Sequence, residues 1–211
     1  MHADDARRLV GRRVAVLVAL AAVLAAVLVG VASLTRSRIE RNEQAWIQQH
    51  LDALVPAGSH DNDLLEDSIS VEAPELLGTT QPVRVYRARR AGQPVAVVIR
   101  SVAPDGYRGP IELLVAIDRE GTLMGVRVLR HNETPGLGDA FETREPEWLD
   151  RFEGLSLSNP PPSRWTVRRD GGDFDAFTGA TITPRAIVKG VRYTLEYYER
   201  HRAMLFEQPA S

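Results

Sequence analysis

The chain has 211 residues, and its 26 basic and 28 acidic side chains give a formal net charge of −2. This near balance provides no basic surface of the kind that binds nucleic acid. Because cysteine is absent, disulfides, thiolate metal sites and cysteine-ligated iron–sulfur clusters are excluded. Redox chemistry would require an organic cofactor or histidine and carboxylate ligands. The five histidines are scattered without metal-ligand spacing, so we expect no metal.

An uncharged apolar segment extends from Val14 to Leu34. As a helix its roughly 21 residues span about 30 Å, the thickness of a bilayer core. A cleaved signal peptide is the alternative, since Gly30-Val31-Ala32 resembles a cleavage site, but signal cores usually run only ~7–15 residues. We therefore predict a single-pass transmembrane helix at 14–34. Four arginines precede it and three follow it, which favours a cytoplasmic tail at 1–13 and a soluble domain outside the cytoplasm.

Residues 35–80 are predicted to form an amphipathic stalk helix and a connector. Apolar residues recur there at helical spacing until Pro56-Ala57-Gly58 stops the pattern. A polar turn at 59–62 and a short mixed segment follow. The residues on the apolar side of the stalk are Ile39, Trp46, Ile47, Leu51, Leu54 and Val55.

Four segments rich in β-branched and aliphatic residues come next, separated by short turn signals. Closely spaced strands joined by short turns predict an antiparallel meander. The predicted strands are 83–88, 94–101, 111–118 and 123–130, and the turns are 91–92, 104–106 and 119–121.

The segment after these strands is predicted to be mixed. Residues 145–152 have helical spacing, with Trp148, Leu149 and Phe152 on one apolar side. Three consecutive prolines make 158–163 a loop. We predict one further short strand at 165–168.

A final amphipathic helix completes the chain. Thr183 is predicted as its N-cap and Pro184 as its first helical residue, and the tail at 206–211 is expected to fray. The predicted fold class is α+β: a transmembrane helix followed by a mostly antiparallel sheet domain with flanking helices, at 81–205. The apolar residues of the final helix are Ala186, Ile187, Val191, Leu195 and Tyr198.

The motif Asp175-Ala-Phe-Thr178-Gly179-Ala180-Thr181 leads into this helix. A helix start offers unpaired N–H groups and the positive end of the helix dipole, so it attracts phosphate. The glycine permits a tight turn, the alanine leaves the approach open, and the two hydroxyls can contact phosphate oxygens. An ordinary capped helix start would have the same residues, so the motif alone leaves both interpretations open.

A second motif, His131-Asn-Glu133-Thr134-Pro135-Gly136-Leu137-Gly138, directly follows the strand at 123–130. Its proline and two glycines shape a loop whose backbone can approach a flat ligand, and its polar side chains can contact that ligand. A hairpin loop without a ligand is the alternative. It is not a dinucleotide fingerprint, because the third glycine position is Phe141 and no parallel βαβ unit is predicted.

Taken in order, the apolar span, "GYRGPIELLVAIDREGTLMGVRVLRHNETPGLGD", "WLDRFEGL" and "GGDFDAFTGATITPRAIVKGV" resemble the G subunit of the bacterial Rnf (or Rsx) electron-transport complex. In that family, and in the related C subunit of the sodium-pumping NADH:quinone reductase, the last threonine of an S/T-G-A-T motif carries FMN. The bond is a phosphoester made by a separate flavin transferase. The resemblance thus implies one covalent FMN on Thr181 and an FMN-binding domain. It implies further cofactor-binding residues at Asp175, Thr178, Gly179, Ala180, His131, Glu133, Thr134, Pro135, Gly136 and Leu137.

The resemblance also implies a function. The chain is expected to be a subunit of a redox-driven ion-translocating oxidoreductase, without a catalytic residue of its own, that relays electrons in ferredoxin- and NAD-linked transfer. The other membrane and peripheral subunits of the complex would be its partners, and its domain would lie on the periplasmic side of the bacterial inner membrane. Pro184, where relatives often have serine, should be harmless.

Three alternatives remain: the covalent-FMN subunit of a quinone reductase, a membrane-anchored flavin regulator, and an anchored assembly module without cofactor, in which 178–183 is only a helix cap.

Overall fold

The computed structural model describes residues 3–207 and, before residue 42, the side chains of residues 13, 17–32 and 35 only. Of the tails predicted at 1–13 and 206–211, residues 1–2 and 208–211 lie outside the described residues. The chain divides into two compact units, Met1–Ile47 and Gln48–Ser211, and each is considered by itself.

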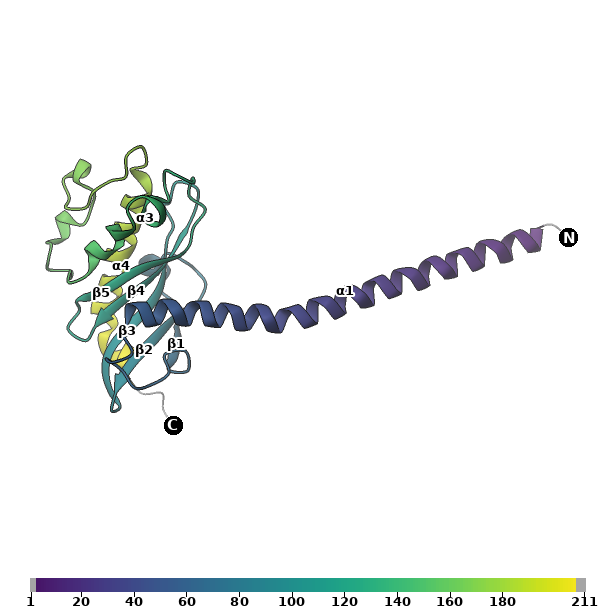
Figure 1. The fold of residues 1–211 in the computed structure, drawn as a ribbon, viewed down its shortest axis with the longest axis horizontal. Helices are drawn as coiled ribbons and strands as arrows, with labels where there is room; N and C mark the ends of the chain where they lie inside the picture. The colour runs from purple at the N-terminus through teal and green to yellow at the C-terminus, as the bar shows by residue number, and fades with distance from the viewer. Residues whose placement is uncertain (1–2, 208–211) are drawn as a thin grey trace. The chain divides into compact units, whose positions relative to one another are not determined.

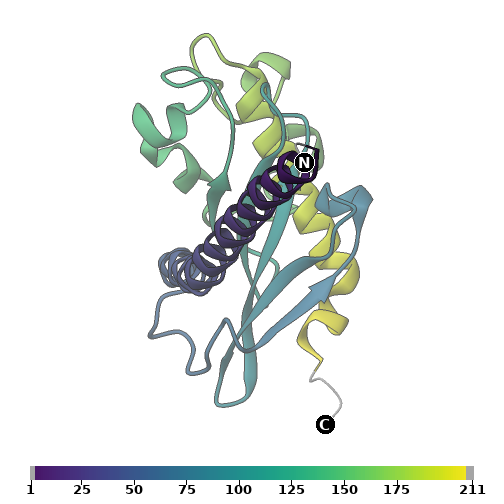
Figure 2. The ribbon, with the colours of Figure 1, turned by 90° about the vertical axis from the view of Figure 1, so that its right-hand side faces the viewer.

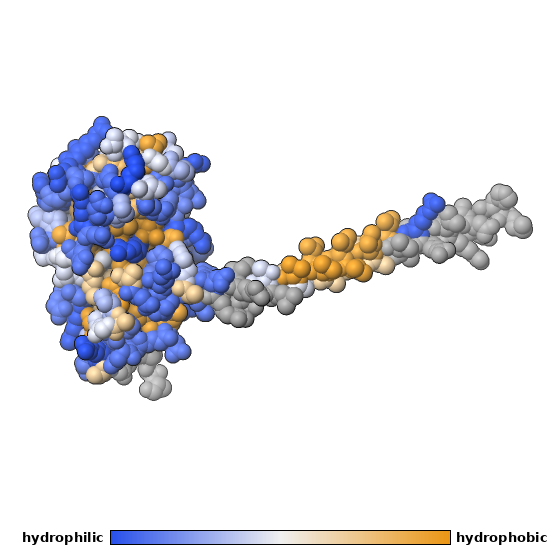
Figure 3. Space-filling model, in the orientation of Figure 1, coloured by the Kyte–Doolittle hydropathy of each residue, from blue (hydrophilic) through white to orange (hydrophobic). Residues whose placement is uncertain are grey.

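Helix α1 runs without interruption from Ala3 to Leu54. Its large side chains between residues 17 and 31 are apolar and more than half exposed, and Figure 3 shows them as a continuous orange band. Within the described part of the chain, no helix is both long and apolar enough to cross a membrane. The span predicted at 14–34 includes residues 14–16, 33 and 34, whose side chains lie outside the described set.

The second unit is an α+β domain built on a five-stranded antiparallel sheet with strand order β1-β2-β3-β4-β5 (Figure 1). The predicted α+β class and the predicted meander are confirmed. The sequence does not predict the first strand, β1, because it has only four residues, in which two serines alternate with Ile69 and Val71. The strands are β1 Ser68–Val71, β2 Val83–Arg90, β3 Gln93–Ala103, β4 Ile111–Asp118 and β5 Leu123–Arg130, and the one-turn helix α2 spans Pro74–Leu77.

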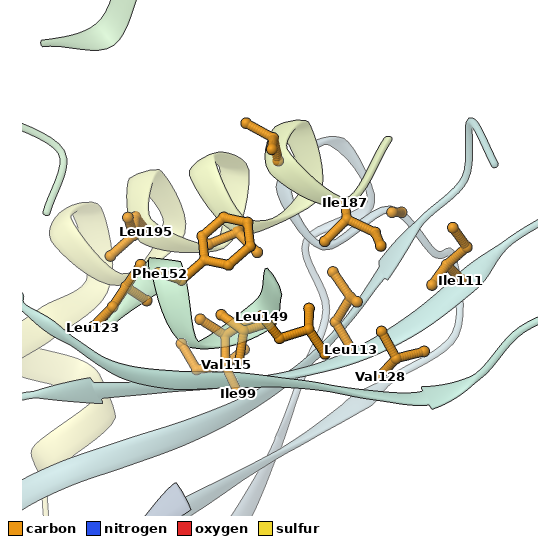
Figure 4. Packing of buried hydrophobic residues seen from close by; sticks show 14 of the residues in the cluster. Ile99, Ile111, Leu113, Val115, Leu123, Val128, Leu149, Phe152, Ile187 and Leu195 are labelled. Carbon is orange, nitrogen blue, oxygen red and sulfur yellow. The ribbon is translucent and has the colours of Figure 1, made fainter. Parts of the chain in front are cut away.

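The main core lies between one face of the sheet and helix α4, which spans Ile182–Phe206. Alternate strand residues point to this face because side chains change sides at every residue of a strand. Figure 2 shows α4 running along the sheet, and Figure 4 shows the strand side chains meeting Ile187 and Leu195 of the helix. The strand residues include Val97, Ile99, Leu113, Val115, Val126 and Val128.

The intervening strand residues are buried on the opposite face, where the end of α1 covers them. Leu51 and Leu54 of α1 are buried, and a side chain at Gly125 of β5 would come within 2.9 Å of Leu54 Cδ2. This face also buries Tyr86, Ala88, Ala96, Val98, Leu114 and Ala116.

Between β5 and α4 the chain forms only short helical pieces: α3 Ala140–Thr143, η1 Pro146–Phe152, η2 Pro162–Arg164 and η3 Arg168–Asp170. The predicted helix at 145–152 is confirmed as the 3₁₀ helix η1, and its three predicted apolar residues are buried. The loop predicted at 158–163 is confirmed, except that η2 begins within it.

The strand predicted at 165–168 is wrong. Val167 forms only an isolated bridge to Phe174, and the chain continues directly into η3. Trp165 and Val167 are buried because a loop packs them into the domain, with the ring of Trp165 5.3 Å from that of Phe174. An alternating pattern of burial arose here without sheet pairing.

We predict that Leu113→Ala lowers the free energy of unfolding by about 2–5 kcal/mol, the cost of a cavity in a close-packed core. Leu113 is fully buried, and a side chain at Gly190 of α4 would come within 3.2 Å of its Cδ1 atom. Urea unfolding followed by tryptophan fluorescence measures the change. Met204→Ala, at a residue 41% exposed on α4, is the control and should stay within about 0.5 kcal/mol of the unmodified chain.

Candidate functional site

The first motif forms a tight turn just before α4. The Ala180 N–H donates to the Phe177 carbonyl over 3.0 Å, which makes Thr178 and Gly179 the two central residues of the turn. Gly179 has a φ of 82°, in the region that favours glycine and that the third position of a type II turn requires. The turn therefore exposes Thr178 and Gly179 at its tip.

Thr181 follows the turn and is the N-cap residue of α4. Its side chain is half-buried and makes no capping hydrogen bond. The first N–H groups of a helix have no partner within the helix, and the helix dipole places partial positive charge there. The hydroxyl of Thr181 thus lies at the electropositive end of a 25-residue helix.

The predicted N-cap, Thr183, lies inside the helix instead, and Pro184 is the third helical residue and not the first. The reason is a side-chain contact that sequence spacing does not reveal. The fully buried Thr183 hydroxyl donates to Glu133 Oε2 over 2.5 Å, so it is not available to cap the helix.

Glu133 of the second motif connects three segments. Its side chain is only 4% exposed, and Oε1 accepts a second hydrogen bond, from the Arg108 N–H in the β3–β4 loop, over 3.1 Å. Two glycines make room for the carboxylate: a side chain at Gly138 would lie 2.6 Å from Oε2, and one at Gly106 would lie 3.0 Å from Oε1. Glu133 thereby holds its own loop, the β3–β4 loop and the start of α4 together.

The rest of the second motif forms another turn. The N–H groups of Leu137 and Gly138 both donate to the Thr134 carbonyl, at 3.1 and 3.0 Å. Pro135 and Gly136 are its central residues, and Gly136 has a φ of 77°, the arrangement typical of a type II turn. This turn carries the chain back toward α4 and leaves the Leu137 side chain 44% exposed.

The two motifs meet at a pocket of about 310 Å³. Of the four exposed large hydrophobic side chains in the described part of residues 48–211, three line this pocket: Tyr107, Leu137 and Ile182. A site with apolar walls and a few polar groups is typical of small-molecule binding. The other lining residues are Glu133, Thr134, Gly138, Gly179, Ala180, Thr181 and Thr183.

Five of the residues expected to bind the cofactor do not line this pocket. Thr178, Pro135 and Gly136 are exposed in the two turns. His131 Nδ1 accepts a hydrogen bond from the Glu133 N–H over 3.1 Å, and its ring centroid lies 5.2 Å from that of Phe141 in an edge-on arrangement. His131 therefore stabilises the loop through contacts within the protein. Asp175 is bound by Arg151 and Arg168.

A larger cavity of about 370 Å³ lies between the end of α1, β5 and η1, but it contains no residue of either motif. Throughout the described residues, no three histidine, aspartate or glutamate side chains gather as a metal site requires.

Residues 106–196 match the family described as FMN-binding domain. The chain is also similar to several proteins named as the G subunit of the ion-translocating oxidoreductase complex. The relative from Shewanella piezotolerans is 44% identical over 178 residues, 84% of each chain. That from Vibrio vulnificus is 46% identical over 176 residues, 83% of each chain, and that from Shewanella oneidensis 44% over 194 residues, 92% of each.

The chain belongs to the family of G subunits of the ion-translocating oxidoreductase complex. In this member of the G-subunit family, every residue that lines the 310 Å³ pocket falls within the FMN-binding domain.

Four lining residues of this G-subunit pocket were absent from the predicted site: Tyr107, Gly138, Ile182 and Thr183. Tyr107 comes from the β3–β4 loop, which the sequence marks only as a turn. Ile182 follows the first motif directly, and its unusual exposure is visible only in the folded chain. The glycine at 138 belongs to the second motif and could have been included for the space it leaves.

We predict that Glu133→Ala destabilises the chain by about 2–3 kcal/mol, because it leaves a buried hydroxyl and a backbone N–H without an acceptor. Glu133→Gln retains one acceptor oxygen and should cost about 1 kcal/mol. Denaturant unfolding of both variants tests this. Glu147→Ala, at an exposed acid of η1, serves as control and should change stability by less than about 0.5 kcal/mol; equal effects at Glu133 and Glu147 would contradict the role given to Glu133.

Proposed function

We propose that this chain is the membrane-anchored flavoprotein subunit of an Rnf-type complex. It carries one FMN as a phosphoester on Thr181 and relays electrons through it in ferredoxin- and NAD-linked transfer coupled to ion translocation. The observation that carries the proposal is the position of Thr181, which makes no side-chain capping hydrogen bond and lines the pocket at which both motifs meet. Membership of the G-subunit family and the FMN-binding domain support it.

The residues present fit the phosphate of FMN. Thr181 stands at a helix start, where N–H groups and the helix dipole favour an anion by roughly 0.3–1 kcal/mol when exposed and up to about 2 kcal/mol when partly buried. That is too little to retain a cofactor by itself. Glu133, which lines the same pocket, adds a carboxylate that repels phosphate. A covalent bond retains the cofactor despite both.

The attachment reaction needs an activated flavin phosphate and a separate flavin transferase. Thr181 Oγ1 forms the new bond to the flavin-side phosphorus of a flavin dinucleotide, and the phosphoanhydride bond of that dinucleotide breaks. The nucleoside monophosphate leaves with the electron pair of that bond, and the hydroxyl proton passes to a base of the transferase. Thr183 is unsuited to the same reaction, because it is fully buried and donates to Glu133.

The pocket walls suit the rest of the cofactor. When bound, FMN supplies one- and two-electron chemistry that no side chain of this protein provides. Tyr107, Leu137 and Ile182 offer apolar surface for a flat ring, and burying them would remove exposed hydrophobic area from water. The protein's part is then to hold and orient the flavin and to shield it from solvent.

We further propose that residues 14–34 anchor the chain in the bacterial inner membrane. The uncharged sequence supports this, as do the exposed apolar side chains of α1 between residues 17 and 31. The arginine distribution favours a cytoplasmic tail at 1–13 and a domain on the periplasmic side, where the other subunits of the complex would meet it.

Replacement of the attachment residue tests the cofactor proposal. Co-expressed with a flavin transferase, the chain should gain the mass of an FMN phosphoester, and Thr181→Val should abolish that gain while Thr181→Ser retains it. Intact-mass spectrometry with peptide mapping measures both. Thr80→Val, at an exposed threonine outside both motifs, is the matched control and should keep the flavin. Covalent flavin on Thr181→Val would overturn the assignment.

Removal of residues 1–35 tests the anchor. The full chain should sediment with membranes and resist alkaline extraction, and the shortened chain should remain in the supernatant. The intact mass of the full chain must include residues 1–32, because a chain beginning after Ala32 would instead be the product of signal cleavage.

A further inference from the structure

Asp175 opens the first motif, yet its side chain points away from the pocket into an ion-pair cluster. Arg151 of η1 binds Asp175 Oδ2, and Arg168 Nε lies 3.1 Å from Oδ1. Both carboxylate oxygens therefore have a cationic partner. The side chain of Asp175 is only 34% exposed.

The backbone of the same segment is also fixed. Trp148 Nε1 donates to the Asp175 carbonyl over 3.0 Å, and Trp148 is 1% exposed. Two residues further along, the ring of Phe177 lies 5.0 Å from that of Trp148. Asp175 and Phe177 are thus held on the domain immediately before the exposed turn at Thr178 and Gly179.

These contacts limit the role that Asp175 can have at the attachment site. Its negative charge would repel a flavin phosphate, and its two oxygens are already occupied by arginines. It also does not line the pocket, so it is not placed to contact a cofactor bound there. Its remaining effect is on the conformation of the turn that follows it.

We propose that Arg151 and Arg168 are positioning residues for flavin attachment, which act through Asp175 to hold the Thr178–Gly179 turn in the conformation that a flavin transferase binds. This inference rests on the proposed function. A transferase that selects one conformation of the turn binds more weakly as that conformation becomes less populated, so the KM for the chain rises while kcat is unchanged. A group taking part in the transfer itself would instead change kcat.

The experiment measures flavin attachment to the full, detergent-solubilised chain by a purified flavin transferase with flavin dinucleotide, as a function of chain concentration. Arg151→Met, Arg168→Met and Asp175→Asn should each raise KM about twofold to fivefold, as expected for partly exposed ion pairs, and leave kcat unchanged. Arg151→Lys keeps the charge, so its KM should stay within about twofold of that of the unmodified chain.

A double-mutant cycle distinguishes this positioning role from direct contact between the transferase and Asp175. If Arg151 acts through Asp175, adding Arg151→Met to Asp175→Asn should raise KM no further. If Arg151→Met leaves KM unchanged while Asp175→Asn raises it, the transferase contacts Asp175 itself and the proposal is wrong. A fall in kcat in the arginine variants would also overturn it.

Arg164→Met is the matched control. It breaks a neighbouring pair with Asp173 of similar exposure, in the same segment but without contact to Asp175, and should leave KM unchanged. Thermal unfolding of each variant confirms that the fold is retained. If the unmodified chain gains no flavin, the proposed function fails; if it gains flavin and the Arg151 and Arg168 variants match it, only the present inference fails.

Discussion

The carboxylate of Glu133 joins three parts of the chain that are far apart in the sequence. It accepts hydrogen bonds from the Thr183 hydroxyl in the first turn of α4 and from the Arg108 N–H between β3 and β4. A buried carboxylate is tolerated only where such bonds replace those it made to water. The shape of the pocket therefore depends on one side chain, and that side chain fits only because Gly106 and Gly138 have none.

The same carboxylate affects how the pocket can hold a phosphate. The start of α4 is electropositive, and Glu133 already places one negative charge close to it, so a second anion there gains less from the helix than it would alone. A phosphate held only by the helix start would be bound weakly. The covalent bond proposed at Thr181 makes retention of the flavin independent of that balance, so the helix end can tolerate both the structural carboxylate and the phosphodiester.

Four of the five strands could be predicted well from the sequence, because they are rich in β-branched or aliphatic residues and end at strong turn signals. The predicted ranges 111–118 and 123–130 coincide with β4 and β5. The local sequence pattern gave wrong predictions where tertiary contacts determine the secondary structure. Strand β1 is an edge strand of four residues, too short for its alternation of serine with Ile69 and Val71 to predict a strand. Residues 165–168 alternate because Trp165 and Val167 pack into the domain. The N-cap of α4 was misplaced because the partner of Thr183 is 50 residues away in the sequence.

For the site, the sequence identified the two loops but not what each residue does within them. Motif residues fall into two groups once the fold is known. Thr181 and Leu137 line the pocket, whereas Gly136 and Asp175 determine the course of the backbone that carries them. The sequence of a motif does not distinguish the two groups. Changing a residue that shapes the turn moves the contacting residue away from the ligand, and changing the contacting residue itself removes the contact, so either change weakens binding. Only the position of each side chain separates them: the Asp175 carboxylate pairs with Arg151 and Arg168 and lies outside the pocket lining, whereas Thr181 and Leu137 belong to that lining.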